Sequence, residues 1–214
     1  EDRLAPATLA YLPGFDGVDL RLTVWGLADA AANDVLSRGT DLLLPVLGAH
    51  LYGHDDADLA AVVLDLLRER NLTLAVAESC TGGLLGGRLT AVPGSSDVFL
   101  GGIVAYTNGM KTTELGVPAN LIETHGAVSE EVVRAMALGV TERLGAGAGV
   151  AITGIAGPSG GTPEKPVGTV WIAAVVKHAQ KAVQRRFPGD REDVRRRSAQ
   201  AGLDVLRRVL VEAQ

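Results

Sequence analysis

The segment AESCTGG (77–83) places a serine at the end of an apolar strand and just before a glycine-rich helix start. Backbone N–H groups at a helix start have no partner within the helix, so they can bind an anion or a developing oxyanion. Ser79 is therefore a candidate nucleophile. The residues expected to bind the substrate or the oxyanion here are Cys80, Thr81, Gly82 and Gly83. Taken alone, such a segment is more often an ordinary Ser/Thr helix cap.

A second polar segment, AYTNGMK (105–111), follows another apolar strand. A serine hydroxyl is a poor nucleophile until a base takes its proton, and none of the four histidines lies in a motif that resembles a Ser-His-Asp site. Lys111 can act as the base if burial lowers its pKa enough to leave it neutral. Tyr106 can pass a proton to a leaving group, and Asn108 is a candidate substrate contact. For this segment alone, an exposed lysine at a helix start is the more common interpretation.

Two further segments could contact a ligand. The glycine-rich stretch 153–169 could wrap a phosphate or a ribose with backbone amides, and its candidate contacts are Thr153, Gly154 and Gly157. It matches neither the Walker A nor the Rossmann pattern. In 187–198, Arg191 lies at a loop-to-helix junction and is the arginine expected to reach the site, whereas its neighbours are interpreted as a solvated face. Scattered histidines and a single cysteine predict no metal site.

Strands that alternate with helices are expected to position these segments. Hydrophobic periodicity predicts helices over 58–70, 81–92, 129–145 and 191–210, and strands over 72–79, 98–107, 149–157, 168–176 and 181–188. The order predicts a three-layer α/β/α sandwich, in which ligands bind beyond the strand ends. The strand over 98–107 is expected to be buried.

A smaller α+β module is expected to precede this domain. Residues 8–12 and 18–26 are predicted strands around a Pro- and Gly-containing turn, and a helix is predicted from Asp29 to about Gly48 with Pro45 as a candidate break. Residues 1–58 hold three basic against ten acidic residues, so this module is acidic. The segment 177–208, by contrast, holds ten basic and four acidic residues. We expect domains at 1–54 and 55–214.

The bulk composition is typical of a globular protein. Of the 214 residues, 47% are hydrophobic and 21% are charged, with a net charge of −5. No run of about 18 apolar residues predicts a membrane span, and the N-terminus does not resemble a secretory signal. The single cysteine, Cys80, excludes an intrachain disulfide and favours a cytoplasmic location. Because the sequence does not begin with Met, we interpret it as a fragment of a longer chain.

Read together, five segments in this order resemble the CinA C-terminal family: AESCTGG, PGSSDVFLGGIVAYTNGMK, HGAVSEE, TGIAGPSGG with EKPVGTVW, and FPGDRE. The resemblance spans about 59–212. Residues 1–53 resemble the KH-like middle region of full-length CinA proteins. Their N-terminal molybdopterin-biosynthesis-like domain has no counterpart in this sequence.

The resemblance implies a nicotinamide mononucleotide deamidase, an amidohydrolase that uses a Ser–Lys–Tyr site. Carried over by motif, these residues are Ser79, Lys111 and Tyr106, and Thr107 stands where relatives more often have serine. The implied mechanism is acyl transfer through an acyl-enzyme, with release of ammonia and nicotinate mononucleotide. The resemblance implies no metal and no organic cofactor. It also suggests a homodimer as the assembly.

Two alternative interpretations remain open at this point. Cys80, beside Ser79, could be the nucleophile, since a thiolate is intrinsically more nucleophilic, although no histidine partner is evident. The chain could instead be a competence-associated module that binds nucleic acid or protein. The segment Gly14-Phe15-Asp16-Gly17 fits the G-x-x-G loop of KH domains. Its acidic surroundings disfavour phosphate binding, so a β-turn is the preferred interpretation and nucleic acid is not an expected partner.

Overall fold

A computed structural model describes residues 2–15 and 17–212 of the chain. The chain divides into two compact units, Glu1–Tyr52 and Gly53–Gln214. The division falls two residues before the domain boundary expected from the sequence.

The small unit is a β-hairpin with one helix. Strands β1 (Thr8–Pro13) and β2 (Val18–Thr23) pair antiparallel, and α1 (Asp29–Leu47) covers part of the hairpin, flanked by the 3₁₀ turns Asp2–Leu4 and Gly48–His50. The predicted second strand is shorter than expected, since it ends at Thr23. The expected break at Pro45 is wrong: α1 continues to Leu47, because a proline this close to the helix end removes little of the hydrogen-bond ladder.

The G-x-x-G segment forms the turn between β1 and β2. The Gly14 N–H donates to the Gly17 carbonyl at 2.8 Å, which closes the hairpin. Asp16, the acidic residue of this segment, lies outside the described residues. The likeness of the small unit to a KH domain therefore stays a prediction.

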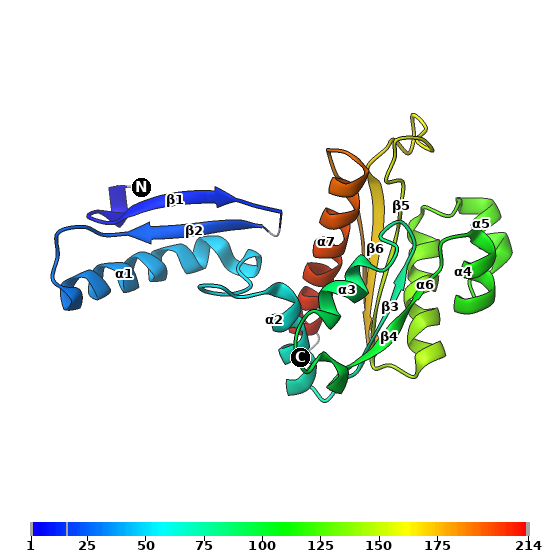
Figure 1. Cartoon of the computed structure of the whole chain (residues 1–214), viewed down its shortest axis with the longest axis horizontal. Helices are drawn as coiled ribbons and strands as arrows, with labels where there is room; N and C mark the ends of the chain where they lie inside the picture. The colour runs from blue at the N-terminus through cyan, green and yellow to red at the C-terminus, as the bar shows by residue number, and fades with distance from the viewer. Residues whose placement is uncertain (1, 16, 213–214) are drawn as a thin grey trace. The chain divides into compact units, whose positions relative to one another are not determined.

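The large unit is built on a five-stranded mixed sheet in the order β4-β3-β5-β6-β7 (Figure 1). Its strands are β3 (Leu74–Glu78), β4 (Phe99–Val104), β5 (Ala148–Gly154), β6 (Thr169–Val176) and β7 (Ala179–Arg186). Strands β4, β3 and β5 run parallel, whereas β6 and β7 continue the sheet antiparallel. The carboxyl ends of the three parallel strands thus meet at one edge.

Helices cover both faces of this sheet (Figure 1). One layer contains α2 (Leu59–Glu69), α3 (Leu84–Thr90) and α7 (Arg191–Glu212), which contact one another, and the other contains α4 (Asn108–Leu115), α5 (Ala119–His125) and α6 (Glu130–Leu144). The three-layer α/β/α prediction is confirmed. None of the helices in the described part of the chain is long and apolar enough to cross a membrane.

Helix α6 provides the main core contact on its side of the sheet. Its buried residues Val132, Met136 and Val140 pack against Ala75 and Ala77 of β3. Ser129 caps the helix start by accepting the N–H of Val132, as the sequence predicts, and Gly145 ends the helix with φ near 64°. This packing holds β3, the strand that directly precedes Ser79, in place.

The structure differs from the sequence-based expectation in three places. The predicted buried strand over 98–107 ends at Val104 and lies at the sheet edge, where alternate residues are exposed. Helix α3 begins at Leu84 instead of 81, because 79–83 form a turn. Helices α4 and α5 were not predicted, since each is short and carries a weak apolar stripe.

Candidate active site

Ser79 directly follows β3, the middle one of the three parallel strands. Its N–H donates to the carbonyl of Ile152 on β5 at 2.9 Å, so the sheet ladder extends to this residue. The residue is 7% exposed. Because β3 lies between β4 and β5, groups at the ends of all three strands can reach the Ser79 hydroxyl.

Lys111 lies in the first turn of α4, whose start is capped by Thr107 through the N–H of Met110. Its Nζ is 3.0 Å from Ser79 Oγ, and it also donates to the carbonyl of Ala105 at 3.0 Å. The side chain is only 2% exposed and forms no ion pair within the residues that the structure describes. Burial lowers the pKa of Lys111, an effect that the neighbouring Cys80 partly opposes. These are the conditions under which a lysine can act as a base.

The structure also brings Tyr106, Arg191 and Gly157 together. Arg191 Nη2 donates to Tyr106 Oη and Nη1 donates to the Gly157 carbonyl, both at 2.8 Å. The Tyr106 side chain is 56% exposed, and its hydroxyl is engaged by Arg191 instead of by Ser79 or Lys111. Arg191 thus connects Tyr106, in the segment after β4, with the glycine-rich loop after β5.

The turn after Ser79 is held by two charged residues, Glu78 and Arg195, that were not among the expected site residues. The interpretation of Arg195 as part of a solvated face is wrong, because its side chain is 25% exposed and binds this turn. Arg195 of α7 donates from Nε to the carbonyl of Cys80 at 3.2 Å and from Nη2 to that of Thr81 at 3.0 Å. The buried Glu78 carboxylate accepts the N–H groups of Gly83, Leu85 and Gly86 at 2.8–3.1 Å. Glu78 was detectable as an acid just before a helix start. Arg195 lies 116 positions after Ser79 and carries no local signal.

Glu78 changes the expected source of oxyanion donors. The N–H of Gly83 and those of the next helical residues already bind a carboxylate, and the N–H of Gly82 donates to the Ser79 carbonyl at 3.2 Å. Among the described residues, no hydrogen bond to another residue uses the N–H of Cys80 or Thr81. The donors available near Ser79 are therefore in the turn, and the start of α3 is occupied.

Comparison with known proteins places this site in a family. The model of the CinA C-terminal domain matches residues 56–210. The chain belongs to the CinA C-terminal domain family. It is 58% identical to a CinA-like protein of Gemmatimonas aurantiaca over 94% of this chain and 47% of that protein, and 47% identical to one of Thermotoga maritima over 91% and 47%. The chain thus spans about half the length of these curated relatives.

Solved CinA-superfamily structures resemble the large unit. The competence/damage inducible protein CihA from Agrobacterium tumefaciens is 38% identical with a TM-score of 0.70, covering 74% of this chain and 98% of that chain. An Escherichia coli protein of the competence-damaged protein (CinA) superfamily is 32% identical with a TM-score of 0.68, covering 78% and 98%. These proteins therefore consist almost entirely of the part they share with this chain.

In this CinA-family chain, the thiol of Cys80 is turned into the protein. Its Sγ packs against Gly154, where an added Cβ would lie 3.1 Å from the sulfur. The residue is buried, and burial raises the pKa of the thiol to about 12, which its own backbone N–H only partly offsets. A buried, protonated thiol is a poor nucleophile, so the geometry disfavours Cys80 as the alternative to Ser79.

The other residues expected to contact the substrate differ in burial and in whether their polar groups are already hydrogen-bonded. Thr153 is buried and donates its hydroxyl to the Ala127 carbonyl at 2.9 Å, so that group is already engaged. Asn108 is exposed at the start of α4, and the Oγ1 of Thr81 is buried without a hydrogen-bond partner in the described structure. Lys165 was not among the residues expected at the site. Its Nζ donates to the His125 carbonyl at 2.8 Å and so anchors the glycine-rich loop.

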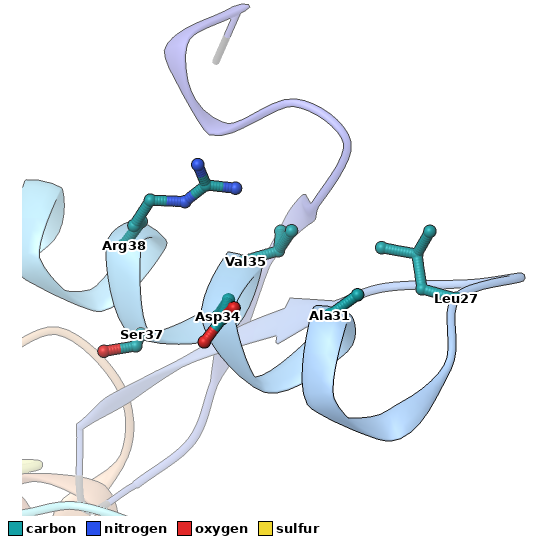
Figure 2. A pocket seen from close by; sticks show the side chains of 6 residues that line it. All are labelled: Leu27, Ala31, Asp34, Val35, Ser37 and Arg38. Carbon is teal, nitrogen blue, oxygen red and sulfur yellow. The ribbon is translucent and has the colours of Figure 1, made fainter.

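A shallow depression of about 420 Å³ lies elsewhere, on the small unit (Figure 2). It is lined by Leu27, Ala31, Asp34, Val35, Ser37 and Arg38, and it contains none of the CinA-family site residues. Within the described ranges, no group of three or more His, Cys, Asp or Glu side chains could hold a metal ion.

Proposed function

We propose that the large unit is a serine amidohydrolase that hydrolyses the carboxamide of nicotinamide mononucleotide. The observation that carries the proposal is the 3.0 Å separation of Lys111 Nζ and Ser79 Oγ in a buried setting that lowers the lysine pKa. A serine beside a neutral amine is an activated nucleophile. The choice of substrate rests on the family resemblance.

In the proposed first step, Lys111 takes the Ser79 proton while Ser79 Oγ attacks the amide carbonyl carbon. The carbonyl oxygen becomes an oxyanion, for which the N–H groups of Cys80 and Thr81 are the available donors. The tetrahedral intermediate collapses, the C–N bond breaks, and ammonia leaves with the proton that Lys111 holds. The product of this step is an ester of Ser79.

Tyr106 has the proposed role of passing that proton to the departing ammonia. Its hydroxyl oxygen accepts a hydrogen bond from Arg191, which leaves the O–H group of the phenol as a donor. Water then attacks the ester, Lys111 again acts as the base, and nicotinate mononucleotide is released. Because Arg191 also binds Gly157, it remains the proposed contact for the substrate phosphate.

Ammonia release tests this proposal. We expect the protein to release ammonia from nicotinamide mononucleotide and much more slowly from free nicotinamide, which lacks the ribose phosphate. Ser79→Ala should abolish turnover, whereas Cys80→Ser should retain most of it because the thiol faces the core. Full activity in Ser79→Ala, or no turnover of the nucleotide by the wild-type protein, would contradict the proposal.

A further inference from the structure

Arg195 holds the backbone of the turn beside Ser79 by two successive carbonyls. Its Nε donates to Cys80 and its Nη2 to Thr81, and the guanidinium is itself paired with Glu192 at 2.9 Å one turn earlier on α7. The side chain is 25% exposed, so these bonds are largely shielded from water. A guanidinium presents its N–H groups in a fixed fork, so one side chain can fix two neighbouring peptide units.

The bonds of Arg195 bear directly on the proposed oxyanion donor. The Cys80 carbonyl and the Thr81 N–H belong to the same peptide unit, so a cation bound to that carbonyl polarises this N–H. A hydrogen bond to a charged group is about twice as strong as one between neutral groups. The Thr81 N–H has no partner of its own in the described residues. Arg195 thus holds and polarises the peptide unit that carries this N–H.

Glu78 explains why such help is needed. Its carboxylate occupies the N–H groups at the start of α3, so the helix end offers little positive potential to an oxyanion. A negative charge this close to Ser79 also opposes the charge that develops during attack. A cation behind the turn compensates for both effects.

Gly82 gives the turn beside Arg195 its backbone conformation. Its φ of +61° is in the left-handed region that favours glycine, and an added Cβ would lie at ordinary contact distance, 3.6 Å, from the Arg195 Nη2. The backbone conformation, and not a lack of space, therefore favours glycine at this position. The ammonium of a lysine at 195 would lack this rigid planar fork and would hold the two carbonyls less precisely.

We propose that Arg195 is a positioning residue that orients and polarises the Thr81 peptide unit for oxyanion stabilisation; this inference rests on the proposed role of Ser79 as the nucleophile. Arg195 acts through the backbone. It therefore affects the rate of acylation of Ser79 and leaves substrate binding largely unchanged.

The test compares Arg195→Ala and Arg195→Lys with Arg208→Ala. Arg208 is a matched control because it lies on α7, pairs with Asp204 within that helix and is more than three turns beyond Arg195. We expect both Arg195 variants to lose kcat by about 10²-fold with KM changed by less than about threefold, since loss of one oxyanion donor costs about 10²–10³-fold. Arg208→Ala should keep wild-type kinetics.

Chemical rescue distinguishes positioning from a general structural role. Added guanidinium chloride at millimolar concentration should restore part of the kcat of Arg195→Ala, whereas equal sodium chloride should not. Arg195→Lys retains the charge and most of the side chain, so it keeps the test valid if Arg195→Ala fails to fold. A kcat within threefold of wild type in folded Arg195→Lys, or a loss confined to KM, would overturn the inference.

A substrate-independent measurement separates this inference from the proposed function. A fluorophosphonate probe should phosphonylate Ser79, with loss of fluoride, in the wild-type protein. It should not label Ser79→Ala, and it should react at least tenfold more slowly in the Arg195 variants. If nicotinamide mononucleotide is not turned over but the probe still reacts more slowly in these variants, the proposed substrate fails and the role of Arg195 stands. Equal labelling rates would refute that role, whatever the substrate is.

Discussion

Lys111 is nearly inaccessible to water, yet its partners are a hydroxyl and a carbonyl instead of a carboxylate. Keeping an ammonium in such a place is costly, because burial removes its hydration and no opposite charge replaces it. The neutral amine is the form that the surroundings favour. At the residue scale, the burial that lets Lys111 act as a base therefore also destabilises the folded protein.

Replacing Lys111 by methionine tests both consequences. We expect Lys111→Met to lower kcat by about 10²–10⁴-fold, the range for loss of a general base. We also expect it to raise the free energy of unfolding by about 1 kcal/mol at neutral pH, so that the variant is more stable than wild type. Methionine fills much the same volume without a charge to desolvate. Urea unfolding and ammonia release measure the two effects. A variant less stable than wild type would show that the lysine is well paired.

The pH dependence follows from the lowered pKa of Lys111. Because the neutral amine is the active form, kcat/KM should rise with pH through that pKa and level off above it. The midpoint of this rise should lie below the ordinary lysine pKa of about 10.4. Between the two pKa values the unfolded chain binds more protons, so wild-type stability should also rise with pH relative to Lys111→Met. A rise centred near the ordinary lysine value would contradict this account.

At the scale of elements, α4 brings Lys111 to Ser79, and its place depends on a glycine in another helix. Gly139 of α6 faces the carbonyl of Leu115 at the end of α4, and an added Cβ would collide with that oxygen. No side chain therefore separates the two helices at this point. The crossing of α4 over α6 is set by backbone contact.

Gly139→Ala should displace α4 and weaken the site. We expect a loss of about 1–3 kcal/mol in unfolding free energy, the usual cost of overpacking, with at least a tenfold loss of kcat as Lys111 moves. Gly87→Ala in α3 is the matched control, because a Cβ there meets open space and alanine favours a helix by up to about 1 kcal/mol. Equal stability in the two variants would exclude the proposed crossing contact.

The sequence predicted most of the elements but only part of the site. Ser79 and Lys111 were predictable because each follows an apolar strand, and parallel strand ends meet at one sheet edge. Glu78 and Arg195 were missed for different reasons. Glu78 was overlooked because it ends an apolar strand, although an acid just before a helix start is a recognisable signal. Arg195 has the sequence context of a solvated arginine, and only the packing of α7 shows that it contacts the turn. The edge position of β4 was missed because strand order is not readable from local periodicity.

At the scale of the whole molecule, the site lies entirely within the large unit. Ser79, Lys111, Tyr106, Arg191 and Arg195 all fall in Gly53–Gln214, which has its own core. Solved relatives that consist almost entirely of the shared part support an independent unit. The described residues of the small unit include few buried side chains, and none of them forms a hydrogen bond described around Ser79.

A chain that starts at Gly53 should therefore fold and keep the activity. We expect its kcat and KM for nicotinamide mononucleotide to lie within about threefold of those of the full sequence, because no hydrogen bond described at the site comes from residues 2–15 or 17–52. Circular dichroism checks the folding of the shorter chain, and ammonia release checks its activity. A tenfold loss of kcat in the folded shorter chain would show that the small unit contributes to catalysis.

The central claim is that Ser79 is the nucleophile and Lys111 its base, and trapping the covalent intermediate tests it most directly. The enzyme is mixed with nicotinamide mononucleotide, quenched in acid during turnover, digested and analysed by mass spectrometry. We predict a nicotinate mononucleotide acyl group on Ser79 that is absent from Ser79→Ala and Lys111→Met. An acyl group on Cys80, or continued ammonia release by Ser79→Ala, would contradict the account.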